Sequence, residues 1–339
     1  MANIFLRSPY NISQSKQGTG LSVVLIIEVD GVEVYTLIKN KLTTSDVVLF
    51  EVSELIRDYL YPKYNGTLVP SDFNSVIVLT YTWKSGLNGT GTTQGTPLVV
   101  NAFGIDAYGY FEDGSNPTTT RGYMQSNDVI YRLSGEPLII PVDRNNVTDI
   151  VSYEAGSPVE GNAITSSLSE VFEYFEYIPS DADEFRLTTT EGIKIVKVLY
   201  IDECKFTPHK ISFVNRWGAI QDLWFFKKAI QSLNVSKDSF KSSSITVTGS
   251  YDVTEHQNKT FNVIAKEKIT LNSGYVSEEY NAPMQELLQS EQVWMEVYDV
   301  ITPMAVTNSS MTFKTGLNDK LVDYKLELDY AFNSINNIR

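Results

Sequence analysis

The sequence is poor in the residues that most often build metal sites and catalytic centres. Its 339 residues include one cysteine, Cys204, and only two histidines, His209 and His256. A single cysteine excludes an intramolecular disulfide framework and a multi-cysteine zinc site. Two histidines leave little material for histidine-centred metal sites or catalytic triads. We therefore expect no bound metal ion and no other cofactor.

Long hydrophobic runs are also missing. The longest apolar stretches, such as residues 23–27 and 76–79, are far shorter than the ~20 residues that a membrane-spanning helix needs. The first ten residues contain Arg7 and Pro9 but lack the apolar core of roughly 7–15 residues that defines a secretory signal. The sequence therefore predicts neither membrane insertion nor export.

Familiar catalytic motifs do not occur. There is no GxxxxGK[ST] phosphate loop, no G-x-S-x-G nucleophile elbow and no H-E-x-x-H zinc motif. Cys204 and His209 would lie about 16 Å apart in an extended strand, with no third group to orient them. We expect a buried, unreactive Cys204 and no enzymatic activity. A glycan-cleaving carboxylate pair leaves no sequence spacing and stays open as a minor alternative.

Basic residues are outnumbered, with 27 Lys and Arg against 41 Asp and Glu and a net charge of −14. Such a chain repels a phosphate backbone, so we expect neither non-specific nor sequence-specific binding of nucleic acid. Residues 1–193 carry 24 acidic and 11 basic side chains, whereas residues 194–228 carry three acidic and seven basic ones. Opposite signs on different surfaces suit a head-to-tail contact between copies, although uneven charge more often marks solvated faces.

Strand patterns dominate what is present. Two apolar runs, 21–29 and 32–38, flank Asp30-Gly31, a dipeptide that favours a tight hairpin turn. Near the C-terminus, apolar and charged residues alternate from 322 to 330, which predicts a strand with one buried and one wet face. We predict a mainly β fold, with two β-sandwich-like antiparallel domains.

Helical signals are few. A short helix is expected at residues 54–60, with Ser53 as its N-cap, and another at 283–289 after Asn281. The Gly-, Pro- and Ser-rich segment 154–167 is the best candidate linker. It predicts an N-terminal β-sandwich-like domain over residues 1–155 and a C-terminal β-rich domain over 156–339.

The segment 204–228 holds an unusual cluster of aromatic and basic residues. Trp224, Phe225 and Phe226 are consecutive, so a strand must send the middle one to the face opposite the other two. An exposed aromatic beside basic side chains is typical of protein interfaces, although core packing is the more common fate of such residues. The candidate interface residues are Trp217, Trp224, Phe225, Lys227 and Lys228.

Several segments resemble virion proteins of known phages. They are residues 211–228, 313–324 and 330–336, together with residues 5–10 (FLRSPY) and 50–59 (FEVSELIRDY). These segments, which lie near both ends and in the middle of the chain, are similar to tail and neck components of tailed phages that infect Bacteroidota, especially crAss-like phages. The resemblance implies a structural protein of the virion, assembled in the host cytoplasm. It supplies no catalytic residue.

The sequence thus favours a virion neck or tail protein that forms a symmetric ring, with other copies of itself and neighbouring virion proteins as partners. The alternative is a receptor-binding or carbohydrate-binding module at the tail tip. Such a module would expose aromatic side chains along a groove, for instance Tyr108, Tyr110 and Phe111 near the Gly-rich loops.

Overall fold

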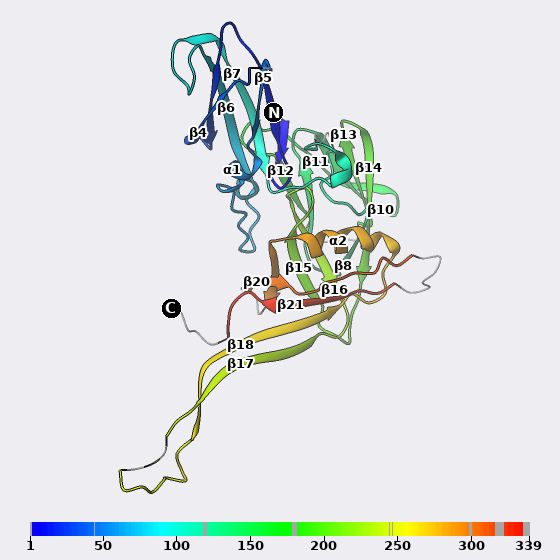
Figure 1. Cartoon of the computed structure of the whole chain (residues 1–339). Coiled ribbons are helices and arrows are strands. Elements are labelled where there is room, and N and C mark those ends of the chain that lie inside the picture. The colour runs from blue at the N-terminus through cyan, green and yellow to red at the C-terminus, as the bar shows by residue number, and fades with distance from the viewer. Residues whose placement is uncertain are drawn as a thin grey trace.

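The computed structural model describes most of the chain. The described residues are 2–43, 45–117, 121–177, 182–243, 245, 247–297, 300–315 and 322–334. The fold is mainly β, with several antiparallel sheets and two short α-helices. Figure 1 shows three groups of sheets and a long two-stranded arm that projects from the lowest group.

The N-terminal group is a small sandwich. A five-stranded sheet, in the order β1-β7-β6-β3-β4, packs against the two-stranded sheet β2-β5. Buried residues alternate along β3 and β6, so each strand presents an apolar face to β2 and β5. The elements are β1 (Ala2–Phe5), β2 (Asn11–Ser15), β3 (Ser22–Val29), β4 (Val32–Asn40), β5 (Val47–Glu51), α1 (Ser53–Arg57), a 3-10 turn (Pro70–Phe73), β6 (Asn74–Lys84) and β7 (Thr93–Ile105).

The middle group is a second sandwich. A five-stranded sheet, in the order β11-β10-β13-β14-β8, faces the two-stranded sheet β12-β9, and the apolar side chains between them form one core. Its elements follow a 3-10 turn (Phe111–Asp113) and are β8 (Val129–Leu133), β9 (Leu138–Asp143), β10 (Val147–Glu154), β11 (Ser157–Ala163), β12 (Phe172–Tyr177), β13 (Glu184–Thr189) and β14 (Gly192–Ile201).

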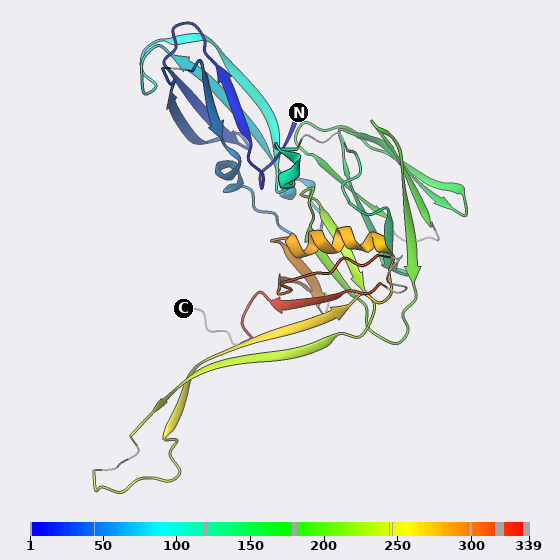
Figure 2. The same ribbon diagram turned by 45° about the vertical axis from the view of Figure 1, so that its right-hand side comes forward.

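The C-terminal group is a seven-stranded sheet in the order β16-β15-β19-β20-β21-β18-β17. Helix α2 (Asn281–Gln289), preceded by a 3-10 turn (Glu278–Tyr280), covers one face of it, where Met284 and Leu287 meet the sheet's apolar side chains (Figure 2). The strands are β15 (His209–Val214), β16 (Ile220–Phe225), β17 (Ile230–Lys241), β18 (Asn258–Asn272), β19 (Val293–Val297), β20 (Val300–Val306) and β21 (Lys325–Tyr330).

A separate core cluster joins the three groups. Phe5 and Phe103 come from the N-terminal sheet, Phe172 from β12, and Val214 and Ile220 from β15 and β16. All five side chains are buried. Since each group contributes to this cluster, the groups are held together by apolar packing as well as by the connecting chain.

Several local predictions are confirmed. Asp30 and Gly31 form the β3–β4 turn with φ of 49° and 80°, the left-handed region that such turns require. In β21, Leu326 and Leu328 are fully buried while Lys325 is exposed. Of the segments that carry the phage resemblance, residues 316–321 and 335–336 lie outside the described part of the chain.

Other local predictions need correction. Both short helices exist, but Ser53 lies inside α1 rather than capping it. Its hydroxyl donates a hydrogen bond to the Glu51 carboxylate. The segment 154–167 is not an open linker, because it contains strand β11, which pairs with β10 across the turn at Ala155-Gly156. The division into domains at residues 155 and 156 stays a prediction.

Candidate assembly surface

The most prominent feature of the molecule is the arm formed by β17 and β18. The two strands pair from Ile230↔Thr270 to Lys241↔Asn258, whereas β21 pairs with β18 only from Lys268 to Asn272. Beyond that point the hairpin leaves the sheet; we define the arm as residues 233–267. Nine residues of β17 in the arm span about 30 Å at the usual rise of a strand. The arm therefore projects well away from the body (Figures 1 and 2).

The arm exposes apolar side chains along its whole length. Every residue of β17 is exposed, as are the first seven of β18. Phe240 and Phe261 form an edge-to-face pair with ring centroids 5.7 Å apart, yet about half of each side chain faces solvent (51% and 50%). The other large exposed apolar residues of the arm are Leu233, Val235, Ile245, Val247, Tyr251, Val253, Val263 and Ile264. Such a continuous exposed apolar surface is typical of an interaction site.

The arm also presents an open strand edge. β17 is the last strand of the seven-stranded sheet, so one row of its backbone N–H and C=O groups faces away from β18. A bulge between Ser236 and Asp238 bends the hairpin, and the Asn262 amide donates a hydrogen bond to Asp238 at 2.8 Å beside it. An exposed edge of this kind is a template for pairing with another chain.

The sequence-predicted interface aromatics lie elsewhere, and two of them are buried within the chain. Phe225 points from β16 into the core beneath α2. Trp224 and Phe226 lie on the opposite face of the strand, where their rings stack with centroids 6.3 Å apart. The expectation of an aromatic on an outer face is wrong here, because β16 also lies against β8 and β9 and both of its faces are covered.

Trp217 occupies the turn between β15 and β16. It is partly buried against the cluster that joins the three groups, and its ring lies edge-on to Phe5 at 6.1 Å. The guanidinium groups of Arg121 and Arg216 lie 5.1 Å and 5.0 Å from the indole ring. Trp217 therefore already packs within its own chain and offers only its remaining exposed surface to a partner.

The basic segment 194–228 is largely neutralised within the chain. Lys194 pairs with Asp128, Lys210 with Glu296, Arg216 with Asp113, and Lys227 with Glu203 at 2.5 Å. The Lys227 ammonium lowers the pKa of the Glu203 carboxyl below its usual range. Lys228 is exposed. The interface roles of Lys227 and Lys228 stay predictions. A basic surface available to a partner must therefore come mainly from residues outside 194–228.

The lone cysteine does not fit its prediction. The Cys204 thiol is exposed, so it does not pack as a small apolar group. Burial lowers the pKa of His209 below its usual value, which keeps the imidazole neutral near pH 7. Among the described residues no group of three or more His, Cys, Asp or Glu side chains converges on a metal site.

Buried carboxylic acids are engaged in structural contacts. The Arg57 guanidinium lies 3.2 Å from Asp106, and Asp143 accepts hydrogen bonds from the Asn145 backbone and the Asn146 amide. Burial raises the pKa of both carboxyls. These contacts hold each acid in place within the fold.

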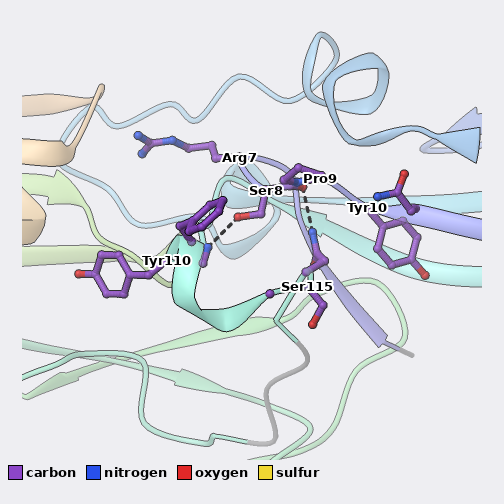
Figure 3. Close-up of a pocket in the computed structure, with 11 residues that line it drawn as sticks. Arg7, Ser8, Pro9, Tyr10, Tyr110 and Ser115 are labelled. Carbon is purple, nitrogen blue, oxygen red and sulfur yellow. Dashed lines mark hydrogen bonds between the residues drawn. The ribbon is translucent and has the colours of Figure 1, made fainter.

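A groove of about 850 Å³ lies between the N-terminal segment and the 3-10 turn Phe111–Asp113 (Figure 3). Tyr10 and Tyr110 stand at opposite sides of it, and the Ser8 hydroxyl between them accepts the Gly109 N–H at 2.8 Å. The Phe111 side chain, another lining residue, is fully exposed. Of the three aromatics predicted for a groove, Tyr110 and Phe111 line this one.

Tyr108, the third, is instead buried. Its hydroxyl donates a hydrogen bond to Gln289 at 2.7 Å, and its ring lies beneath the Arg7 guanidinium at 4.8 Å. Tyr108 thus contacts Arg7, which lines the groove, while the Arg216 guanidinium lies 4.2 Å from the ring centroid of the lining residue Tyr110.

Comparisons with known proteins give little further guidance. No protein-family model and no curated protein matches the chain. Among solved structures, one similar chain is a chimeric titin Z1Z2-Z1Z2 tandem functionalised with an exogenous GRGDS peptide from fibronectin. It is 13% identical over 57% of this chain and 93% of its own, with a TM-score of 0.17. A similarity that low supports no inference about this protein. None of the helices in the described residues has the length and hydrophobicity to cross a bilayer.

Proposed function

We propose that this chain is a structural subunit of a bacteriophage virion, a neck or tail component that assembles into a ring through contacts between copies. The observation that carries the proposal is the arm, whose apolar side chains are exposed along both strands. Isolated exposed apolar residues are ordinary, but ten large ones on one projecting hairpin need a partner surface.

The resemblance of the sequence to virion proteins is consistent with this role. An assembly protein needs large complementary surfaces more than a reactive site, and the exposed apolar arm offers such a surface. A projecting hairpin can reach a neighbouring subunit without disturbing the core of its own, because its base is fixed by the buried side chains of Ile269 and Leu271.

The test compares two variants that remove exposed aromatic side chains. The double variant Phe240→Ser, Phe261→Ser alters the arm, and Phe111→Ser alters the groove of Figure 3, so each is the control for the other. Mass in solution should show wild-type and Phe111→Ser chains assembling and the arm variant remaining monomeric. If the arm variant assembles as well as the wild type, the arm is not the assembly surface. A wild-type chain that stays monomeric at high concentration and low salt overturns self-assembly altogether.

A second function, carbohydrate or receptor binding, is favoured by the groove that Tyr10, Tyr110 and Phe111 line. Aromatic faces beside hydrogen-bonding groups suit ligands with both apolar and polar surfaces, such as sugars. Binding of host-surface glycans measured by calorimetry should then be lost in Phe111→Ser and kept in the arm variant. Absence of binding by the wild-type chain rejects this second function.

A further inference from the structure

Beside strand β12 lies a groove of about 570 Å³ on the middle group of sheets. Residues 173–177 all line it, five consecutive positions of one strand. Since successive side chains of a strand point to opposite faces, a cavity that touches all five must run along the strand's edge. Residues 162–165, at the end of β11, form part of the facing wall.

Both walls are strands with an open side. β12 pairs with β9 in a sheet of two, and β11 is the last strand of its five-stranded sheet. A strand edge that borders a groove is the usual acceptor when an extended segment of another chain adds to a sheet. The groove is therefore shaped to receive a strand.

The lining of this groove is acidic on balance, with Glu160, Glu173 and Glu176 against Arg144. Residues 147–177 contain six Asp and Glu side chains and no Lys or Arg. Arg144 pairs with Glu170 and, at 3.2 Å, with Glu173. Glu160 and Glu176 are exposed groove residues without a cationic partner in the described part of the chain. An incoming strand must therefore be basic or neutral.

The two strands of the arm have that character, although the whole chain is acidic. Residues 233–241 and 258–267 carry four lysines against two acids, a net charge of +2. Lys237, Lys241 and Lys259 are exposed and have no acidic partner among the residues described. The open edge of β17 therefore brings unpaired backbone groups, apolar side chains and positive charge together.

Resting on the proposed assembly role, we propose that the arm of one copy docks in the acidic groove of the next, with the β17 edge pairing along β12. The arm points away from the middle sheets in both views, so it does not reach the groove of its own chain (Figures 1 and 2). The occupant is thus a second copy of the same chain. One subunit donates and the next accepts, which is a heterologous, head-to-tail contact.

A charge swap tests this contact. Lys237→Glu with Lys241→Glu reverses the arm, and Glu160→Lys with Glu176→Lys reverses the groove. Each double variant should weaken assembly by about tenfold or more, because attraction becomes repulsion. The chain that carries all four changes should assemble like the wild type. Lys63→Glu with Lys84→Glu is the matched control, equal in charge and remote from the arm, and should assemble normally.

A cross-link gives a second, direct readout. In a Cys204→Ser background, Ser239→Cys on the arm and Asn162→Cys at the groove should form intermolecular disulfides on mild oxidation, and neither cysteine alone should do so. If the wild type assembles but neither cross-links nor responds to the four charge changes, this docking is wrong and the proposed function stands. A wild-type chain that never assembles overturns both.

Discussion

Glu286 is the residue that ties helix α2 to the rest of the molecule. Its carboxyl group is buried and accepts hydrogen bonds from the Ser126 hydroxyl and from the Arg216 backbone N–H at 3.4 Å. Ser126 precedes β8, and Arg216 lies in the β15–β16 turn. One side chain thus links the middle sandwich to both layers of the C-terminal group.

This burial makes stability depend on pH in a defined direction. Burial raises the pKa of Glu286 above its ordinary value, with the Ser126 hydroxyl, the Arg216 N–H and the charges of Arg216 and Arg121 opposing the shift. The folded chain therefore holds this proton more tightly than the unfolded chain, and the free energy of unfolding falls as pH rises between the two pKa values.

Glu286→Gln keeps the group neutral at every pH. The difference in unfolding free energy between variant and wild type should therefore move in favour of the variant as pH rises from about 4 towards neutrality. Urea unfolding at a series of pH values measures it, and Asp106 and Asp143, which are present in both proteins, cancel in the difference. A difference that moves towards the wild type would mean that Arg216 and Arg121 favour the ionised form.

Leu326 tests the faces of β21. Leu326→Ala should lower the free energy of unfolding by about 2–5 kcal/mol, through lost burial and the cavity left behind. Its neighbour Lys325 is exposed, so Lys325→Ala should change stability by less than about 0.5 kcal/mol. Chemical denaturation of both variants gives the two values. The reverse order of effects would put the strand in the opposite orientation.

At the residue scale, sequence patterning was reliable where one face of a strand is wet. The alternation around Leu326 correctly separates buried from exposed positions, because each charged neighbour marks the solvent side. For Trp224 and Phe225 the alternation again separates the two faces, but the expectation that one of these faces is exposed is wrong. Strand β16 is covered by α2 and the C-terminal core on one face and by β8 and β9 on the other. Nothing in a local pattern tells which distant strands will cover a second face.

Among the elements, the arm should be the least stable part of the isolated chain. Its backbone pairing is two-stranded and its side chains are exposed, so little burial opposes local opening. Hydrogen exchange should be fast for amides of residues 233–241 in the monomer and at least about tenfold slower in the assembly. Amides of β15, inside the seven-stranded sheet, serve as the control and should be slow in both states. Equal exchange of the arm in both states would contradict a role in contact.

The sequence predicted those elements whose ends are marked by turn-forming or helix-starting residues. Asp30-Gly31 marks the β3–β4 hairpin, and a proline near the first turn marks α2. The sequence patterns did not predict the arm. Its mixture of apolar and polar residues resembles that of any half-buried strand. Sequence alone cannot show whether the surface that such a strand contacts belongs to the same chain or to another.

At the scale of the whole molecule, the acidic groove and the lysine-bearing strands of the arm belong to different groups of sheets. The predicted charge complementarity involved residues 194–228, but four of their basic side chains pair within the chain. In the proposed docking, the acidic surface is a small part of residues 1–193, the edge strands around Glu160 and Glu176. Composition shows that the N-terminal part of the chain is acidic. Which acidic surface could accept a strand depends on where the sheet edges lie, and composition does not show that.

Head-to-tail contact by arm and groove has two possible outcomes, because a repeated rotation either closes into a ring or continues as a filament. The ring proposed here predicts one discrete mass that does not change once the concentration exceeds the assembly threshold. Each contact should bury more than about 1,000 Å². Native mass spectrometry and light scattering over a concentration series distinguish the two, since a filament keeps growing with concentration.

Salt separates the electrostatic part of this contact from its apolar part. Exposed charge pairs are screened beyond about 10 Å at 0.1 M salt, so the assembly threshold of the wild type should rise as salt is added. The arm variant Lys237→Gln, Lys241→Gln, which removes two positive charges, should start with a higher threshold and change less with salt, because two of the charges proposed to meet Glu160 and Glu176 are gone. Salt does not screen apolar contacts, so those of Phe240 and Phe261 should supply the affinity between copies that remains at high salt. If the two proteins respond to salt identically, the lysines of the arm do not face the acidic groove, and the ring must close through another surface.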